Sequence, residues 1–435
     1  MTALSWEHIH FIGIGGAGMS GLAMIAAELG VRVTGSDAAV SKNVDFLADR
    51  GIATTVGHSG GLPGSPSMVV YSTAVQTDNP ELARAAVDGV PLIRRGEFLA
   101  LLADRYSCVV AVAGSHGKTT VTGMLCHILI AAGREPGYLI GGRVVGRHAS
   151  AAAGRGELFV TEVDESDGTQ AAMRCAHGII TNIEDDHAWS LGGIEQLHQC
   201  FSDFADGAEY VLAGEAATTR ELLHDHPNVE FLSPSGIPEG LTLRVPGPHN
   251  LLNAAFAVCI AVQSGVPEAD AIQSLGSFEG IDRRLSVRWR HAGIRLVDDY
   301  AHHPTEVRAG ITALREQYPA CRLRIVFQPH RYERIARYAA DFACELSLAD
   351  ETFIMPVFNA WVNDQDLADP RRIADAITTG SAEFWDDSIA ALATRVADTA
   401  RSGDVIAIMG AGDIDQIIPL MIDQLEGRWG VESET

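Results

Sequence analysis

The sequence predicts an α/β protein with three domains, each built on a parallel β-sheet. Strand-like apolar segments alternate with helix-like segments, which is typical of βαβ units. The alternation begins at residues 8–15 and begins again near residues 105 and 290. Nearly every polar cluster follows the end of a predicted strand, where ligands bind in open parallel sheets. We therefore expect three domains, at residues 1–104, 105–289 and 290–435. We expect their ligand sites at these strand ends.

The individual elements follow from the apolar pattern and from the residues that interrupt it. Gly30 closes the first predicted helix, because a glycine just past the last turn is typical of helix ends. Predicted helices lie within residues 18–30, 41–51 and 119–133. Predicted strands lie within residues 8–15, 31–37, 67–75, 107–113, 157–167, 177–187, 293–304, 321–330, 351–358 and 403–413.

The composition indicates a soluble globular protein, with 47% hydrophobic and 20% charged residues. The formal net charge of −24 argues against general binding to nucleic acids or anionic membranes. The sequence has no apolar run long enough to span a membrane and no export signal at its N-terminus. The seven cysteines form no CxxC pair, so we expect buried thiols in a reducing compartment and no zinc site. These features predict a cytoplasmic location.

The first glycine-rich loop predicts a site for a diphosphate. Gly13, Gly15 and Gly18 fit the G-x-G-x-x-G pattern between a strand and a helix, and Asp37 ends the next strand. This is the dinucleotide-binding fingerprint, and by itself it proposes NAD. A nucleotide sugar would fit equally well, because the glycines and the helix N-terminus approach any pyrophosphate. The alternative is a glycine turn that only packs the helix on the strand.

The second loop, GSHGKTT, predicts a nucleoside triphosphate site. Val112 stands where the strict P-loop has glycine, but a strand precedes the loop and a helix follows it. Lys118 can reach the β- and γ-phosphates, and a threonine hydroxyl can bind Mg²⁺. Lys42 and Lys118 are the only lysines among 32 Lys and Arg residues, which fits a role at residue 118 that arginine cannot fill. We therefore expect a central P-loop ATPase domain whose loop residues are Gly114, Ser115, His116, Gly117, Lys118, Thr119 and Thr120.

Two acidic clusters follow the next strands, at residues 162–167 and 184–187. Carboxylates at strand ends beside a phosphate loop are expected ligands of Mg²⁺. We expect one ligand from each cluster, while the other carboxylates face water. His187 alone is weak evidence, since most single histidines are structural.

Asn250 and Asn253 lie at helical i, i+3 spacing, which places both on one face at a helix start. N-capping by Asn250 is the alternative, and it explains only one of the two residues. Two adjacent histidines, His302 and His303, could hold a metal, but they point in different directions and lack a third ligand at the usual spacing.

Arg331 and Arg334 follow a further strand end, where they can share a helix face and grip a carboxylate. Surface ion pairs with Glu333 or Asp341 are an equally good interpretation of that spacing.

The ordered motifs HFIGIGGAGMSGLA, GSHGKTT, EVDESD, NIEDDH, GPHNLLNA, RR, DDYAHHPTE, FQPHRY and GAGDI resemble those of the Mur ligases of peptidoglycan synthesis. The resemblance runs from about residue 8 to residue 414. It implies that the first loop holds the UDP of a nucleotide sugar and the second holds ATP, so NAD is not implied. The third, Rossmann-like domain would close over both and deliver an amino acid.

The resemblance also implies roles for individual residues. It implies catalytic roles for Lys118, His187 and Arg284, and Mg²⁺ ligation by Thr119, Glu162 and His187. It implies that ATP contacts the second loop together with Asn250, Asn253, Arg284 and Asp299. The UDP-sugar residues that it implies are Gly13, Gly15, Gly16, Ala17, Gly18, Met19, Ser36, Asp37 and Ser72. Amino-acid placement is implied for Tyr300, His302, Arg331 and Arg334.

The activity implied is addition of L-alanine to UDP-N-acetylmuramate through an acyl phosphate, by a monomer or dimer without nucleic-acid or membrane partners. The motif that alanine-adding members usually carry, Asp-x-Tyr, is replaced here by a segment containing Phe358, Asn359 and Trp361, and Ala301 replaces a usual glycine. A recycling ligase that adds a preformed tripeptide to the same sugar therefore stays open. Further alternatives are a nicotinamide oxidoreductase, which would leave Lys118 unexplained, and a non-catalytic nucleotide-binding module.

Overall fold

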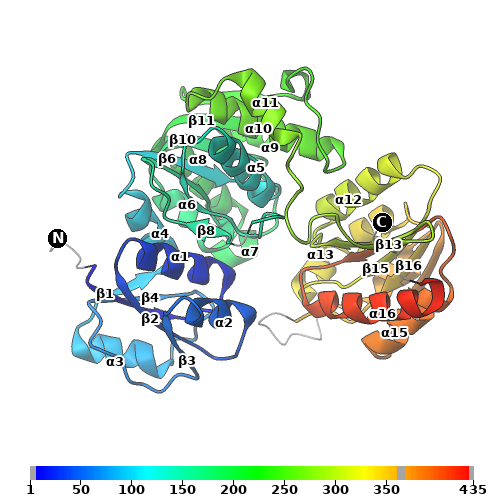
Figure 1. Ribbon diagram of the computed structural model, residues 1–435, viewed down its shortest axis with the longest axis horizontal. Helices are drawn as coiled ribbons and strands as arrows, with labels where there is room; N and C mark the ends of the chain where they lie inside the picture. The colour runs from blue at the N-terminus through cyan, green and yellow to red at the C-terminus, as the bar shows by residue number, and fades with distance from the viewer. Residues whose placement is uncertain (1–5, 148, 360–367, 431–435) are drawn as a thin grey trace. The chain divides into compact units, whose positions relative to one another are not determined.

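The computed structural model describes residues 6–147, 149–359 and 368–430. These residues form three β-sheets flanked by helices, which confirms the predicted three-domain α/β fold (Figure 1). The chain separates into two compact units. The first unit, Met1–Leu243 with Leu251–Glu279, contains the first two sheets, and the second, Arg244–Asn250 with Gly280–Thr435, contains the third.

The first sheet has the strand order β3-β2-β1-β4-β5, and all its pairings are parallel. Its strands are β1 (His8–Ile12), β2 (Arg32–Asp37), β3 (Ala53–Val56), β4 (Met68–Tyr71) and β5 (Leu92–Arg94). Its helices are α1 (Ala17–Glu28), α2 (Lys42–Ala48), α3 (Pro80–Asp88) and α4 (Arg95–Ala103). The polar residues after β1 and β2 therefore meet at one edge of the sheet.

The second sheet has the order β12-β11-β10-β6-β9-β7-β8, with β8 antiparallel to β7. Its strands are β6 (Cys108–Ala113), β7 (Gly137–Leu139), β8 (Ala151–Ala152), β9 (Leu158–Glu162), β10 (Cys175–Ile180), β11 (Ala208–Gly214) and β12 (Val229–Leu232). Its helices are α5 (Lys118–Ala131), α6 (Thr169–Ala172), α7 (Ala188–Leu191), α8 (Ile194–Gly207), α9 (Ala217–Leu223), α10 (Pro248–Gln263) and α11 (Glu268–Leu275), with 3₁₀ turns η1 (Glu165–Asp167) and η2 (Pro234–Gly236). Strand β6 lies between β9 and β10, so the second glycine loop is flanked by both acidic clusters.

The third sheet has the order β13-β14-β18-β15-β16-β17. Its strands are β13 (Ser286–His291), β14 (Ile294–Asp299), β15 (Arg322–Phe327), β16 (Glu351–Ile354), β17 (Ser381–Phe384) and β18 (Asp404–Met409). Its helices are α12 (Pro304–Gln317), α13 (Tyr332–Leu346), α14 (Arg371–Ala376), α15 (Ile389–Asp398) and α16 (Ile417–Trp429), with the 3₁₀ turn η3 (Asp413–Gln416).

Local sequence explains where several helices begin and end. Ser41 caps α2 by accepting a hydrogen bond from the Val44 amide, as expected of an N-cap serine. The predicted end of the first helix at Gly30 is confirmed, because α1 ends at Glu28 and Gly30 has a φ of +84°. A residue with a side chain would be strained in this left-handed conformation.

Apolar residues lie on both faces of the third sheet. In β15, Leu323, Ile325 and Phe327 face one apolar cluster, while Val326 faces another on the opposite side. Helices therefore cover both faces of the third sheet, as parallel sheets require. In the first unit one apolar cluster continues from the first sheet into the second, and it includes Phe98 and Phe159. This shared core joins the two sheets into one compact unit.

Three details differ from the sequence-based expectations, of which the first is the antiparallel strand β8 in the second sheet. The third sheet carries an antiparallel edge strand, β13, because Ala292 and Gly293 make a tight turn with φ values of +50° and +80°. Such a two-residue turn permits a hairpin, whereas parallel strands need a long crossover. The expectation of buried cysteines is wrong for Cys344, which is exposed on α13, and holds fully for Cys126 and Cys175. Among the described residues, no helix combines the length and the apolar character needed to cross a membrane.

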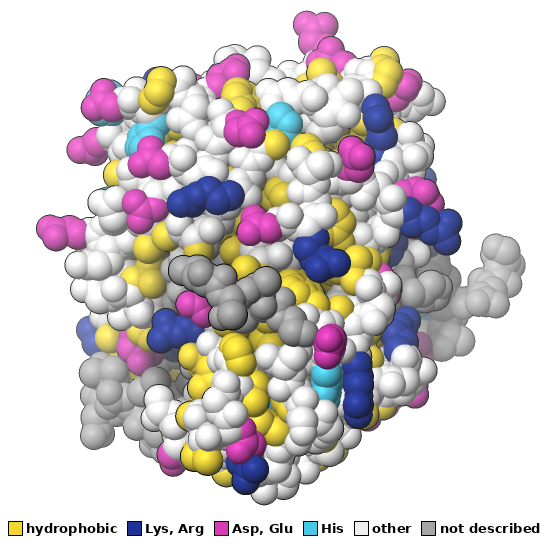
Figure 2. All heavy atoms as spheres, turned by 90° about the vertical axis from the view of Figure 1, so that its left-hand side faces the viewer, with side chains coloured by type: hydrophobic (Ala, Val, Ile, Leu, Met, Phe, Trp, Pro, Cys, Tyr) yellow, Lys and Arg dark blue, Asp and Glu magenta, His cyan; other side chains and the backbone are white. Residues whose placement is uncertain are grey.

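Acidic side chains are distributed over the face shown in Figure 2, interspersed with separate Lys and Arg side chains. On the described residues of this face the basic groups do not merge into one broad positive surface. This distribution agrees with the strongly negative net charge.

Candidate functional site

The first glycine loop is held against the end of β2 by its own amides. The Gly13 and Ile14 amides donate to the Ser36 carbonyl, at 2.8 and 3.0 Å. The Gly15 amide donates to Asp37 Oδ2 at 2.8 Å. A Cβ atom at Gly15 would lie 2.9 Å from the same oxygen, so glycine is needed for this approach. Asp37 therefore clamps the loop itself, in place of the ribose contact that the NAD fingerprint proposes.

The loop leads into α1 through Gly16, and no side chain caps this helix N-terminus in the described structure. The first amides of a helix are natural donors to phosphate oxygens. Ala17 and Gly18 are the first two residues of α1, and Met19, the third, is buried. Ser72 lies beside the loop, since a Cβ atom at Gly13 would lie 3.5 Å from the Ser72 Cβ.

Ser36 lies at the end of β2, and its side chain does not enter the first glycine loop. Its side chain is fully buried, and its hydroxyl donates to Glu81. His58 Nδ1 lies 3.2 Å from the same carboxylate of Glu81. Ser36 can therefore position the loop through its carbonyl oxygen, while its hydroxyl belongs to a buried polar network.

The second glycine loop folds around the ammonium group of Lys118, the first residue of α5. Lys118 Nζ donates to the carbonyls of Gly114 and Ser115, at 2.5 and 3.1 Å. It also lies 2.6 Å from Glu165 Oε2. Burial alone would lower the pKa of Lys118, but Glu165, together with Asp164 and Glu162, outweighs it and the pKa is raised. The lysine is therefore charged and already aimed into the loop.

The end of β10 fixes the shape of this loop. The His116 amide donates to Asn182 Oδ1 at 2.9 Å, and the His116 carbonyl accepts from Thr181 Oγ1 at 2.6 Å. Gly114 and Gly117 have φ values of +128° and +87°, which favour glycine. Sequence reasoning missed Thr181 and Asn182, which lie inside the strand predicted at residues 177–187 but directly follow the observed strand β10.

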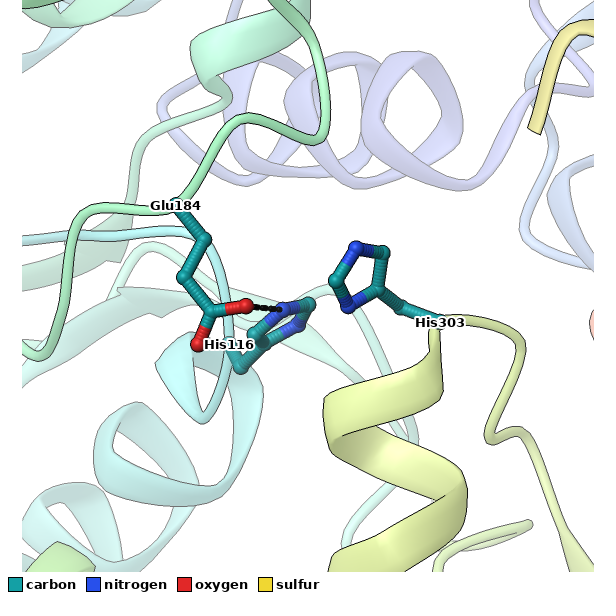
Figure 3. A group of neighbouring side chains, drawn as sticks. All are labelled: His116, Glu184 and His303. Atoms are coloured by element: carbon teal, nitrogen blue, oxygen red, sulfur yellow. Dashed lines mark ion pairs between the residues drawn. The ribbon is translucent and has the colours of Figure 1, made fainter. Parts of the chain in front are cut away.

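Figure 3 shows that the His116 side chain of this loop faces Glu184, which follows β10. The His116 Nε2 and Glu184 Oε2 atoms lie 3.4 Å apart. This pair links the second acidic cluster to the glycine loop.

The first acidic cluster lies against the start of α5. Thr119 Oγ1 donates to Glu162 Oε2 at 2.7 Å. His187 Nε2 lies 3.8 Å from Glu165 Oε1 and 3.4 Å from Asp186 Oδ2. The structure thus pairs Thr119 with Glu162 and places His187 beside Glu165, which also contacts Lys118.

The oxygen atoms of this cluster suit a hard divalent cation. Glu162, Glu165 and the Thr119 hydroxyl offer the oxygen donors that Mg²⁺ prefers. Gly141 leaves the room that Glu162 occupies, because a Cβ atom there would overlap with Glu162 Oε1. Burial and the neighbouring Asp164 raise the pKa of Glu165 to about 7, against the opposing effect of Lys118. A cation would offset the negative charge that surrounds the buried Glu165 carboxyl, so the residues present fit the metal.

Asn250 and Asn253 are both buried residues of α10. A Cβ atom at Gly117 would lie 2.7 Å from Asn253 Oδ1, which places Asn253 beside the phosphate loop. The capping alternative for Asn250 is wrong. This residue lies inside the first turn of α10, and its Nδ2 atom donates to the Pro246 carbonyl at 2.7 Å.

In the second unit, Arg284 Nη1 lies 3.3 Å from Glu306 Oε1, and its guanidinium lies over the Tyr300 ring. Asp299 ends β14 and is buried. Burial, followed by Glu306 and Asp298, raises the pKa of Asp299 to about 7, although Arg284 opposes this. Sequence reasoning missed Glu306, whose i+4 spacing from His302 was the available signal.

The residues implied for amino-acid placement gather at the ends of β14 and β15. The ring centroids of Tyr300 and His302 lie 5.3 Å apart, and those of His302 and His330 lie 5.6 Å apart. Arg334 is buried, and its Nη1 donates to the His330 carbonyl at 3.3 Å. The ring of Phe358 lies nearly parallel to that of His330, with centroids 5.7 Å apart. Trp361 lies outside the described residues.

The expectation that Arg331 and Arg334 share a helix face is wrong. Arg331 precedes α13 and has a φ of +69°, in the left-handed region, so only Arg334 is helical. The backbone explains the difference, since the Arg331 amide donates to the Phe358 carbonyl at 3.1 Å and is drawn out of the helix.

A glycine loop around a partly buried lysine, with a threonine hydroxyl and carboxylates beside it, defines a nucleotide-binding α/β protein of the P-loop class. Comparison with known families gives the particular group. The Mur ligase family catalytic domain matches residues 8–107, the Mur ligase middle domain matches residues 112–213, and the Mur ligase glutamate ligase domain matches residues 283–412. The chain belongs to the Mur ligase family.

Individual relatives match over the whole length. A UDP-N-acetylmuramate–L-alanine ligase of Kineococcus radiotolerans is 38% identical, covering 97% of this chain and 96% of the relative. The crystal structure of a UDP-N-acetylmuramate–alanine ligase from Thermotoga maritima is similar, with a TM-score of 0.82 and 27% identity over 97% of this chain and 99% of that one. A murein peptide ligase from Psychrobacter arcticus has a TM-score of 0.72 at 24% identity, over 99% of this chain and 100% of that one, and shows the shared fold alone.

Proposed function

We propose that the protein joins L-alanine to the lactyl carboxylate of UDP-N-acetylmuramate, at the expense of ATP. The observation that carries the proposal is the partly buried Lys118 ammonium, which contacts Glu165 and two loop carbonyls where a phosphate chain would lie. Full-length similarity to proteins named as L-alanine ligases supports the choice of both substrates. The same similarity disfavours the nicotinamide oxidoreductase.

The reaction has two steps with balanced atoms. A lactyl carboxylate oxygen attacks the γ-phosphorus of ATP, ADP leaves, and an acyl phosphate forms. The amine of alanine then attacks the acyl carbon, the phosphate leaves with the bonding electron pair, and the amine loses a proton. Lys118 stabilises the charge that develops on the transferred oxygens, because its ammonium group is already held at the phosphate loop. Mg²⁺, when bound, would supply Lewis-acid neutralisation of the phosphate oxygens.

The residue roles are part of the proposal. Thr119, Glu162 and His187 would hold or orient Mg²⁺, with Glu165 beside them. Asn250, Asn253, Arg284 and Asp299 would contact ATP together with the second loop. The first loop, with Gly13 to Met19, Ser36, Asp37 and Ser72, would hold the UDP group. Alanine would be placed by Tyr300, His302, Arg331 and Arg334.

The remaining expectations also enter as proposals. Domain boundaries near residues 105 and 290 fit the start of β6 and the hairpin of β13 and β14. A cytoplasmic location would give access to ATP. A monomer or dimer is expected, and sedimentation would decide between them.

Phosphate release by the purified protein tests the function. The assay contains ATP, Mg²⁺ and UDP-N-acetylmuramate, with L-alanine, glycine, L-serine or the tripeptide L-Ala-γ-D-Glu-meso-diaminopimelate added separately. Release that depends on L-alanine supports the proposal. Release only with the tripeptide would assign the chain to the recycling reaction, and release with none of the four would refute ligation to this sugar.

A further inference from the structure

Arg95 connects the first sheet to the acidic loop of the second. It is the first residue of α4, directly after β5. Its Nη2 atom donates to Asp164 Oδ2 at 2.9 Å and to Asp167 Oδ2 at 2.5 Å. Both carboxylates lie in the loop that follows β9, on either side of Glu165. One guanidinium therefore fixes two points of the loop that also carries the partner of Lys118.

The backbone at the start of α4 lies close to Thr169. A Cβ atom at Gly96 would overlap with Thr169 Oγ1, so the start of α4 touches the residue that follows the acidic loop. Thr169 in turn donates through its amide to Asp167 Oδ1, at 3.1 Å. Arg95 and Gly96 thus hold one loop at two neighbouring positions.

The other side of the guanidinium faces the first glycine loop. A Cβ atom at Gly18, in the first turn of α1, would lie 3.0 Å from Arg95 Nη1. The same side chain is therefore packed between the helix start that would receive the UDP group and the loop beside the ATP site. Its remaining exposure is 22%.

The ion pairs of this loop fall on two basic residues, although Asp164 also acts electrostatically on Lys118 and Glu165. Lys118 pairs with Glu165, and Thr119 donates to Glu162. Arg95 pairs with the two remaining carboxylates of the cluster, Asp164 and Asp167. Arg95 thereby offsets the charge of both aspartates, of which Asp164 also acts electrostatically on Lys118.

We propose that Arg95 is a positioning residue that sets the spacing between the nucleotide-sugar loop and the acidic loop of the ATP site. This inference rests on the proposed function, because the spacing matters only when a group on one nucleotide attacks the other. Misplacement of two reactants by about 1 Å costs about 10²-fold in rate. Loss of Arg95 therefore affects the chemical step more than the binding of either nucleotide.

The test compares Arg95→Gln, Arg95→Lys and Asp167→Asn with the full-length wild-type protein. Calorimetry measures the Kd of UDP-N-acetylmuramate and of Mg·ADP separately, and phosphate release gives kcat with L-alanine. In Arg95→Gln we expect kcat to fall about 10²-fold, with each Kd within about threefold of wild type. Arg95→Lys restores one charge without the planar fork, so partial recovery of kcat is expected.

Arg322→Gln is the matched control. Arg322 makes a bidentate pair with Asp404 at the first residue of β15, at 3.0 and 2.7 Å. Its loss should lower the thermal midpoint without a 10²-fold change in kcat. If Arg95→Gln fails to fold, Asp167→Asn removes one of the two ion pairs of Arg95 from the partner side, and the Asn oxygen can still accept from Thr169.

Unchanged kcat in Arg95→Gln, or in Asp167→Asn where the first variant does not fold, would overturn the inference. A Kd for UDP-N-acetylmuramate that rises as much as kcat falls would also overturn it, because Arg95 would then bind substrate. Failure of the wild-type protein to release phosphate would instead count against the proposed function. The two failures are therefore separable.

Discussion

The Lys118 ammonium and the Glu165 carboxylate lie 2.6 Å apart, and each is the other's principal charged neighbour. The lysine is raised in pKa by this carboxylate, whereas the carboxyl is raised by burial in spite of the lysine. A phosphate chain in the loop would compete with Glu165 for Lys118. The contact with Glu165 therefore keeps Lys118 charged and in position until a phosphate chain binds in the loop.

Replacement of this lysine should abolish turnover. In Lys118→Ala we expect kcat to fall by about 10³-fold, because a fixed charge that stabilises the transferred phosphate is lost. The Kd of UDP-N-acetylmuramate, measured by calorimetry, should not change, since its loop is the first one. Lys42→Ala is the natural control, because Lys42 is the other lysine of the sequence and is exposed at the start of α2. Equal turnover in Lys118→Ala and wild type would contradict the assignment.

Titration of Glu165 should make stability depend on pH. Its carboxyl pKa is raised from 4.5 to about 7 in the folded chain, so the folded state holds this proton more tightly than the unfolded state. The contribution is fully present below pH 4.5 and is lost as the pH rises through 7. Glu165→Gln removes this titration, so its thermal midpoint should rise relative to wild type between pH 5 and pH 8.

The control for this pH series is Glu195→Gln, since Glu195 is exposed in the first turn of α8. Its midpoint should stay parallel to that of the wild-type protein over the same range. A constant difference between Glu165→Gln and wild type at every pH would show that Glu165 does not titrate there.

Thr119 should set the Mg²⁺ requirement. Its hydroxyl lies 2.7 Å from Glu162, so the two oxygens can bind one cation together. Thr119→Ala should raise the Mg²⁺ concentration for half-maximal phosphate release by about tenfold, as is typical when a group that orients a metal ligand is lost. Thr119→Ser keeps the hydroxyl and should retain the wild-type requirement. A shift of the same size in both variants would show that the lost methyl group, and not the hydroxyl, matters.

Most of the fold could be predicted because its signals are local. The alternation of apolar segments and the glycine loops at strand ends is enough to locate β1, β6 and the helices that follow them. The antiparallel strand β13 is harder to predict, because it depends on a turn at Ala292 and Gly293 that no apolar period marks.

The site likewise contains residues that a local motif predicts and residues that only distant contacts determine. Lys118 and Thr119 follow from the loop motif, whereas the choice of Glu165 as the partner of Lys118 depends on which of four nearby carboxylates the 3₁₀ turn brings closest. Arg331 was misplaced because its conformation is set by a hydrogen bond to Phe358, a residue distant in the sequence. Arg95 was missed for a similar reason, since its two aspartate partners lie about 70 residues away.

Gly117 should be required for nucleotide binding, in addition to allowing the left-handed backbone conformation. It has a φ of +87°, and a Cβ atom there would lie 2.7 Å from Asn253 Oδ1. Gly133 has a similar φ of +71°, at the end of α5, but nothing lies within 4 Å of its Cβ position. Both alanine variants bear the strain of the left-handed conformation, about 1 kcal/mol or more. Only Gly117→Ala should also lose Mg·ADP affinity, by at least about tenfold in calorimetry, because the loop must move away from Asn253. Equal affinity in the two variants would show that the loop tolerates a side chain at Gly117 and that its shape is not set by this contact.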